Sequence, residues 1–174
     1  SLERSASAHP ENVALKLDLG FAYLVAGRAK DALDVLSATP EDPGNVRRQT
    51  LMLAAIAATK GTSAARDELP RLVAAHPNSA EVSTIAAAFY AQHGDLARAR
   101  EQMQAALKAD AKYVPAMLGA SRLEMLAGDK VAAQRYIDQA LALDGKNVNA
   151  RVVAARIAAD ARDIEAALTH LEAA

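Results

Sequence analysis

The sequence predicts an all-α protein, an α-solenoid of antiparallel helix pairs with about five repeats and a partial helix at the N-terminus. Two observations carry this prediction. Alanine fills about a quarter of the 174 residues, whereas aromatic residues make up only 3%, and such a composition favours helices over strands. Residues that interrupt helices also recur about every 17 positions, so a helix, a tight turn, a second helix and a loop follow one another repeatedly.

Two series of helix-breaking positions alternate along the chain. The first has steps of 34, 33, 34 and 34 residues and consists of Gly27, Gly61, Gly94, Gly128 and Arg162. The second has steps of 33, 34, 34 and 34 and consists of Pro10, Pro43, Pro77, Ala111 and Gly145. We expect one helix between successive breakers, which makes eleven with the partial helix at 1–8. The repeats then form a single domain, 1–174, and span residues 12–45, 46–78, 79–112, 113–146 and 147–174.

Between the breakers, apolar residues follow a helical period. Leu15, Leu19, Ala22 and Ala26 recur at steps of four, three and four, which places them on one face of a helix. Residues that cap helix N-termini stand at the matching starts. They are Asn12, Ser79 and Asn147 before the first helix of a pair, and Asp95, Asp129 and Asp163 before the second.

The spacing resembles the tetratricopeptide repeat, whose 34-residue unit shows Leu-Gly-x-x-Tyr, then Ala-x-x-x-Phe, then Pro. Leu19, Gly20 and Tyr23 match the first part, and Ala32 and Leu36 follow in the second. The small position recurs as Gly20, Ala54, Ala87, Ser121 and Ala155, and the second-helix alanine as Ala32, Ala65, Ala99, Ala133 and Ala167. The resemblance covers essentially the whole chain, although the family's Trp is absent, and it implies a right-handed superhelix.

Small residues are expected where the two helices of a pair approach each other, because axes only about 8–10 Å apart leave little room for side chains. Ser121 is therefore predicted to face Ala133 within one pair, and Ala87 to face Ala99 in the pair before it.

The residue pattern argues against an enzyme and against a cofactor or metal site. The chain has no cysteine, which excludes disulfides, thiol nucleophiles and cysteine-ligated metals. The four histidines include no i, i+4 pair and no HExxH motif. Gly119-Ala120-Ser121 begins like a nucleophile elbow but lacks the second glycine and falls inside an expected helix, so we interpret Ser121 as a packing residue.

The net charge and the hydropathy of the chain argue against nucleic acid and membrane as its partners. Twenty basic and 21 acidic residues give a formal charge of −1, which offers no general attraction to nucleic acid. An RNA-reading helical repeat protein is therefore only a distant alternative. No stretch approaches the ~18 apolar residues of a membrane span, so we expect no direct insertion. The first residues lack a charged start followed by an apolar run, so we expect no signal peptide in them.

The resemblance implies a protein or peptide partner in the concave groove, which the first helix of each pair lines. Carried over residue by residue, the groove comprises Leu17, Phe21, Leu24, Arg48, Leu51, Ala55, Ala58, Glu81, Thr84, Ala88, Gln92, Leu118, Arg122, Met125, Val152 and Arg156. Relatives that clamp a C-terminal carboxylate carry Lys and Asn where Leu17 and Phe21 stand. An apolar channel edged by Arg122 and Arg156 suits an amphipathic helix or an extended apolar peptide with an acidic residue. Alternatively, the apolar residues pack against the second helices, and the convex face or the loops bind the partner.

Both ends of the chain fall inside an expected helix, so we expect a window from a longer array. Leu168 and Leu171 would then be uncovered, with end-to-end self-association as a consequence. The alanine-rich, cysteine-free composition with Ala-Gly-Asp turns resembles bacterial envelope lipoproteins and assembly factors of exopolysaccharide or protein secretion. We therefore expect a scaffold in the periplasm or envelope, with a cytoplasmic assembly adaptor or regulatory protein as the alternative.

Overall fold

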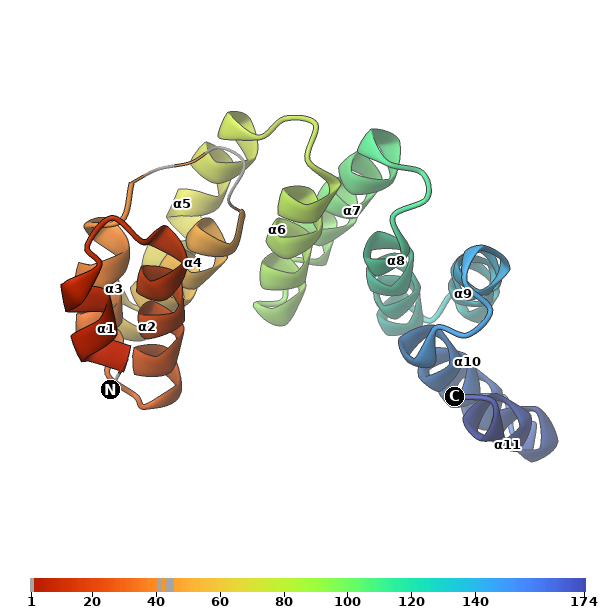
Figure 1. Ribbon diagram of the computed structural model, residues 1–174. Coiled ribbons are helices and arrows are strands. Elements are labelled where there is room, and N and C mark those ends of the chain that lie inside the picture. The colour runs from red at the N-terminus through yellow and green to blue at the C-terminus, as the bar shows by residue number, and fades with distance from the viewer. Residues whose placement is uncertain (1, 41, 43–45) are drawn as a thin grey trace. The chain divides into compact units, whose positions relative to one another are not determined.

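The computed structural model describes residues 2–40, 42 and 46–174, and Figure 1 labels their helices. These residues form eleven helices and no strand, so the all-α prediction and the number of helices are confirmed for this part of the chain. The predicted breaker Pro43 lies outside the described residues. None of the helices within the described ranges is long and apolar enough to cross a membrane.

The chain divides into two compact units, Ser1–Pro77 and Asn78–Ala174. The N-terminal unit contains α1 (Leu2–Ala8), α2 (Val13–Val25), α3 (Ala29–Ser37), α4 (Val46–Lys60) and α5 (Thr62–Ala75). The C-terminal unit contains α6 (Ala80–Gln92), α7 (Leu96–Ala109), α8 (Val114–Ala127), α9 (Lys130–Leu143), α10 (Val148–Asp160) and α11 (Ile164–Glu172).

Side-chain caps start six of these helices, at the positions that the sequence predicts. In each, a side-chain oxygen accepts a hydrogen bond from the backbone N–H three residues later, at 2.9–3.2 Å. The six residues are Asn12, Ser79, Asp95, Asp129, Asn147 and Asp163. Since the first N–H groups of a helix lack partners within it, each cap satisfies a donor that would otherwise depend on water.

The tight turn inside each pair contains a residue with positive φ. The four glycines of the first breaker series have φ between 74° and 89°, and Arg162, the fifth member, has φ 62°. Arg162 is the one non-glycine residue with positive φ in the described part of the chain. The turn therefore keeps its geometry in the fifth repeat, although an L side chain makes that geometry unfavourable.

The helices pack as antiparallel pairs, α2 with α3, α4 with α5, α6 with α7, α8 with α9, and α10 with α11. First helices also contact the next first helix, as α2 does with α4 and α8 with α10. The two helices of a pair approach each other closely, which explains why small residues stand where they meet. A Cβ added to Gly20 on α2 would lie only 2.8 Å from Leu36 Cδ2 on α3. Ala87, Ala99, Ser121 and Ala133 are all fully buried, as the predicted packing requires.

Candidate functional site

The structure divides the predicted groove residues by accessibility. Eight of them are exposed to solvent, namely Phe21, Ala58, Glu81, Ala88, Gln92, Arg122, Val152 and Arg156. Phe21 is 51% exposed and Val152 is 48% exposed. Leu24, Thr84 and Met125 are half-buried. The remaining five, Leu17, Arg48, Leu51, Ala55 and Leu118, are buried, so their expected place on an open lining is corrected.

Four of the buried residues belong to the apolar cores. Leu17, Leu51 and Ala55 lie in one cluster with Ala32 and Leu36 of the N-terminal unit. In the C-terminal unit, Leu118 lies in a cluster that includes Val153 and Ala154 of the next first helix. The contact between successive first helices covers this side of each of them, which hides the residues that point towards the following repeat.

The fifth buried residue, Arg48, caps the preceding helix. Its guanidinium Nε donates hydrogen bonds to the carbonyl oxygens of Leu36 at 3.2 Å and Thr39 at 2.9 Å. Leu36 lies in the last turn of α3 and Thr39 just beyond its end, where a positive charge is favourable, and Leu36 O also accepts from the Thr39 N–H. Arg48 therefore stabilises the link between the first and second repeats and is not available at the surface.

We call the exposed residues of α6, α8 and α10 in this set the first-helix face; they are Glu81, Ala88, Gln92, Arg122, Val152 and Arg156. Ala88, Arg122 and Arg156 occupy the same position in three successive repeats, at steps of 34 residues. Neither Arg122 nor Arg156 forms a hydrogen bond or an ion pair with any described residue. Two exposed cations thus stand on neighbouring helices of one unit.

Several other arginines join helices instead. Arg100 on α7 binds Glu124 on α8 through both carboxylate oxygens, at 3.1 and 2.9 Å, and these hydrogen bonds raise the pKa of Arg100. Glu124 occupies the position that Tyr23 and Tyr90 hold in other repeats. Arg47 on α4 likewise pairs with Asp18 on α2 at 2.7 Å. Such pairs connect successive repeats, which distinguishes their arginines from those of the first-helix face.

A tyrosine-centred cluster attaches α1 to the first helix pair. The Tyr23 hydroxyl donates to Glu3 Oε1 at 2.8 Å, and Arg28 Nη1 donates to the same oxygen at 3.1 Å. Arg28 also pairs with Asp31 at 2.6 Å and stacks over the Tyr23 ring at 4.3 Å. The hydrogen bond from Tyr23, followed by that from Arg28, lowers the pKa of the Glu3 carboxyl, so we assign the cluster a structural role.

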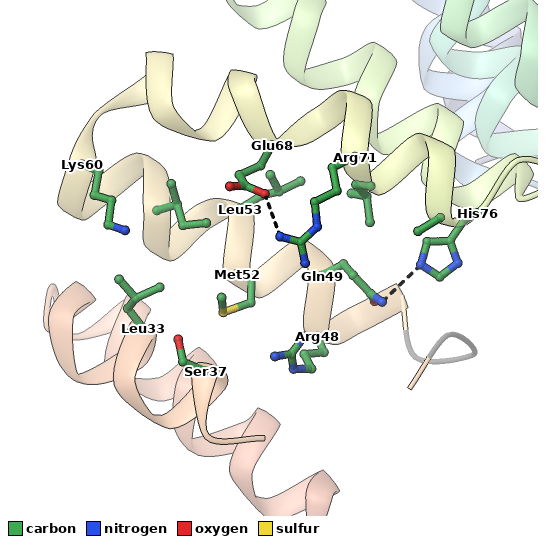
Figure 2. Close-up of a pocket in the computed structure, with 13 residues that line it drawn as sticks. Leu33, Ser37, Arg48, Gln49, Met52, Leu53, Lys60, Glu68, Arg71 and His76 are labelled. Carbon is green, nitrogen blue, oxygen red and sulfur yellow. Dashed lines mark hydrogen bonds and ion pairs between the residues drawn. The ribbon is translucent and has the colours of Figure 1, made fainter. Parts of the chain in front are cut away.

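A cavity of about 380 Å³ lies between α3, α4 and α5 of the N-terminal unit (Figure 2). We call it the second-helix pocket, because α3 and α5 are the second helices of their pairs. It is lined by Leu33, Ser37, Arg48, Gln49, Met52, Leu53, Ile56, Lys60, Glu68, Arg71, Leu72, Ala75 and His76. The residue pattern did not predict this pocket, because the apolar residues of its lining have the spacing of an ordinary helix core.

The second-helix pocket combines an apolar interior with a charged edge. Figure 2 shows Leu33 and Ser37 on α3 across from Met52 on α4, with Glu68 and Arg71 projecting from α5. Glu68 and Arg71 form an ion pair at 3.7 Å. The Gln49 amide donates from Nε2 to His76 Nε2 at 3.3 Å, while Gln49 Oε1 is buried and has no hydrogen-bond partner among the described residues.

Ser121 lies in the interior of α8 and is fully buried, so a substrate cannot reach its hydroxyl. Among the described residues, no three histidine, aspartate or glutamate side chains gather in a metal-binding group.

Two family models described as tetratricopeptide repeat match residues 1–57 and 52–114. A search of the curated proteins finds no match.

Solved structures resemble the chain at low sequence identity. The crystal structure of the yeast Tom70 superposes with a TM-score of 0.85 at 16% identity, over 98% of this chain and 37% of that one. TTC0263, a tetratricopeptide repeat protein of Thermus thermophilus, gives 0.71 at 20% identity, over 91% and 88%. A tetratricopeptide repeat protein from Parabacteroides merdae gives 0.71 at 19%, over 98% and 68%. At these identities the likeness shows the fold alone.

The family matches, the 34-residue period, the left-handed turns and the pairwise packing agree with one another. Tetratricopeptide repeats are protein–protein interaction scaffolds and are generally not enzymes. The chain belongs to the tetratricopeptide repeat family.

Proposed function

We propose that the chain is a non-enzymatic scaffold whose first-helix face binds an acidic peptide or amphipathic helix of a partner protein. The observation that carries this proposal is the pair of exposed guanidinium groups, Arg122 and Arg156, at one repeat position. An arginine without an intramolecular partner can bind a carboxylate of another molecule with two parallel hydrogen bonds.

The spacing of the face suits a polypeptide. Packed helices lie about 8–10 Å apart, so the arginines of α8 and α10 match carboxylates roughly two turns apart on a helix, or about three residues apart on an extended strand. The exposed side chain of Val152 and the half-buried side chain of Met125 add apolar surface beside these cations. A partner segment with alternating apolar and acidic residues would contact both the apolar surface and the two arginines.

Peptides selected on the full chain from a random display library test this proposal. We expect the bound peptides to be enriched in Asp and Glu, and the double variant Arg122→Glu/Arg156→Glu to weaken their binding at least about tenfold, or roughly 1.4 kcal/mol. Arg135→Glu, an exposed arginine on the second helix α9, is the matched control. Circular dichroism verifies that the variants stay helical, and unchanged binding by the double variant would contradict the proposal.

The cellular setting is a further part of the proposal. The composition and the Ala-Gly-Asp turns support a place in a bacterial envelope assembly or secretion system, as a lipoprotein or periplasmic factor. A cytoplasmic adaptor is the alternative, and fractionation of cells that express the full-length protein separates the two. An electrophoretic shift of single-stranded RNA would instead support the distant RNA-binding alternative.

Self-association at α11 is also proposed. Ile164, Leu168 and Leu171 are 61%, 53% and 52% exposed, so burial against a second copy would remove apolar surface from water. Light scattering at rising concentration should show a dimer that Leu168→Glu abolishes. A strict monomer at all concentrations would contradict this idea.

A further inference from the structure

We propose that copies of the chain associate head to tail, with α11 of one copy docking on α2 of the next in place of the start of α1. We call the exposed apolar residues Val152, Leu168 and Leu171 the tail, and Ala22 and Tyr23 on α2 the head. This inference rests on the self-association proposed above and names the surface that α11 meets.

The tail exposes positions that earlier repeats bury. Leu171 is 52% exposed, whereas Leu36 and Ile137, at the same repeat position, are fully buried. Val152 is 48% exposed, whereas Leu118 is 8% exposed. In the earlier repeats a first helix covers these positions, since α4 packs on α2 and α3, and α10 packs on α8 and α9. The tail is therefore the surface on which a first helix docks elsewhere in the same chain.

The head belongs to a first helix whose usual partner is incomplete. The helix α1 has seven residues, whereas the second helices α7 and α9 have 14 each. Ala22 on α2 is exposed, whereas Leu123 and Ile157, at the same repeat position, are each 5% exposed. The C-terminal part of α2 thus leaves room for the N-terminal part of a second helix, which α11 supplies.

A contact inside the chain shows how the tail and the head meet. Arg100 holds the repeat position of Leu168, and Glu124 holds that of Tyr23. Arg100 on α7 binds Glu124 on α8 at 2.9 Å. In the same arrangement, Leu168 of one copy lies beside Tyr23 of the next, so that an apolar side chain meets an aromatic ring where the chain itself uses an ion pair. Burial of this leucine removes apolar surface from water.

The helices α1 and α11 carry the same acidic residue for α2. Glu172 holds the repeat position of Glu3, and a leucine precedes each of them. The Tyr23 hydroxyl and Arg28 Nη1 both donate to Glu3 Oε1, at 2.8 and 3.1 Å, so Glu172 of another copy brings a carboxylate to the same donors. Ala6 is the one buried residue among those described in α1, and a helix of seven residues has little stability of its own. The start of α1 can therefore give way to α11.

Charge favours the head over a second tail as the partner of α11. The helix α11 contains Glu165 and Glu172 and no lysine or arginine, so two α11 helices side by side bring like charges together. The head instead offers the guanidinium group of Arg28. A head-to-tail contact also leaves a free head and a free tail after each step, so association continues beyond the dimer.

Two variants that complement each other test this inference in the full chain. Leu168→Glu blocks the tail and Ala22→Glu blocks the head, and both residues are exposed, so neither substitution should disturb the fold. Ala14→Glu, at an exposed alanine near the other end of α2, is the matched control. Sedimentation velocity at rising concentration measures association, and circular dichroism verifies that the variants stay helical.

We expect the wild type and Ala14→Glu to associate alike, and Leu168→Glu and Ala22→Glu each to associate at least about tenfold more weakly. An equimolar mixture of the two blocked variants should recover association but stop at the dimer, because only one head and one tail remain intact. Association of Ala22→Glu alone at the wild-type strength, or a mixture that stays monomeric, would overturn the head-to-tail contact while leaving self-association through α11 in place. A monomeric wild type would overturn both proposals.

The exchange of carboxylates has its own test. Glu3→Gln should strengthen association about threefold, because it loosens α1, whereas Glu172→Gln should weaken it by a similar factor. Glu165→Gln, at the other carboxylate of α11, should change it little. Weaker association of Glu3→Gln, or equal effects of Glu172→Gln and Glu165→Gln, would overturn the docking of α11 in place of α1.

Discussion

Arg48 Nε donates a hydrogen bond of 2.9 Å to the carbonyl oxygen of Thr39, nine residues earlier in the chain. Through this bond, the buried guanidinium group of Arg48 on α4, the first helix of one repeat, caps the C-terminus of α3, the second helix of the preceding repeat. The relationship explains why Arg48 is 7% exposed although it is charged, because a buried charge is tolerated when hydrogen bonds satisfy it.

The first prediction concerns this cap. Arg48→Met should lower the free energy of unfolding by about 2–3 kcal/mol, because it leaves buried carbonyl oxygens without their charged donor. The neighbouring substitution Arg47→Met removes only an exposed ion pair with Asp18, which should cost less than about 1 kcal/mol. Urea denaturation followed by circular dichroism compares the two, and equal losses would refute the capping role of Arg48.

The second prediction concerns the left-handed turns. Arg162→Gly should stabilise the protein by about 1 kcal/mol, because glycine adopts positive φ without the steric penalty of a Cβ. Gly128→Ala should destabilise it by a similar amount through backbone strain alone, since no heavy atom lies within 4 Å of the added Cβ.

Thermal unfolding can measure these opposite effects. A change of 1 kcal/mol corresponds to a shift of about 2–4 °C in Tm for a chain of this size. A lower Tm for Arg162→Gly would contradict the idea that this turn is strained.

The third prediction concerns close packing in the first pair. Gly20→Ala gains up to about 1 kcal/mol of helix propensity, but its Cβ would meet Leu36 Cδ2 at 2.8 Å and Cγ at 2.9 Å. Leu36 is fully buried and cannot move freely, so overpacking of about 1–3 kcal/mol should prevail.

A double-mutant cycle provides the control. Leu36→Val shortens the side chain that the new Cβ meets, so Gly20→Ala should cost less in the Leu36→Val background than in the wild type. Additive free energies would show that the two residues do not interact.

The fourth prediction concerns pH and the cluster around Tyr23. The folded state lowers the pKa of Glu3 from its ordinary value of 4.5, mainly through the hydrogen bond from Tyr23. This carboxylate therefore stabilises the fold at pH values above 4.5, and the contribution disappears as the pH falls through the lowered pKa.

Denaturation of wild type and Glu3→Gln at several pH values can measure this effect. The difference in stability should be largest at neutral pH and should vanish in acid. In a Tyr23→Phe background the difference at neutral pH should shrink, because the main hydrogen bond to Glu3 is gone. A difference that does not vary with pH would contradict the prediction.

Local features of the fold could be predicted because their causes lie within a few residues. The caps at Asn12 and Asp129 depend on a side chain and a backbone N–H three positions away. The turn at Arg162 could be placed without a glycine, since the 34-residue period continues through it. The same period predicted small buried residues such as Gly20 and Ser121, but in the second repeat it indicated Ala54, which is exposed, whereas the neighbouring Ala55 is buried.

The candidate surfaces could be predicted only in part. Leu118 and Val152 hold one position in successive repeats, yet the first is 8% and the second 48% exposed. Their local sequences do not distinguish them, because a residue at this position is buried only when another first helix covers it. The second-helix pocket could not be predicted from the sequence either, because its lining comes from three helices whose packing the local sequence does not determine.

The residue pattern alone was sufficient for the all-α class, the period, the helix starts and the family, because backbone hydrogen bonding and helical periodicity act over short stretches of chain. The packing of one helix against another decided which arginines form ion pairs, which are buried and which face solvent. Arg48 and Arg122 illustrate the difference: both were expected on a binding surface, but the end of α3 holds one, while nothing in the described part of the chain binds the other.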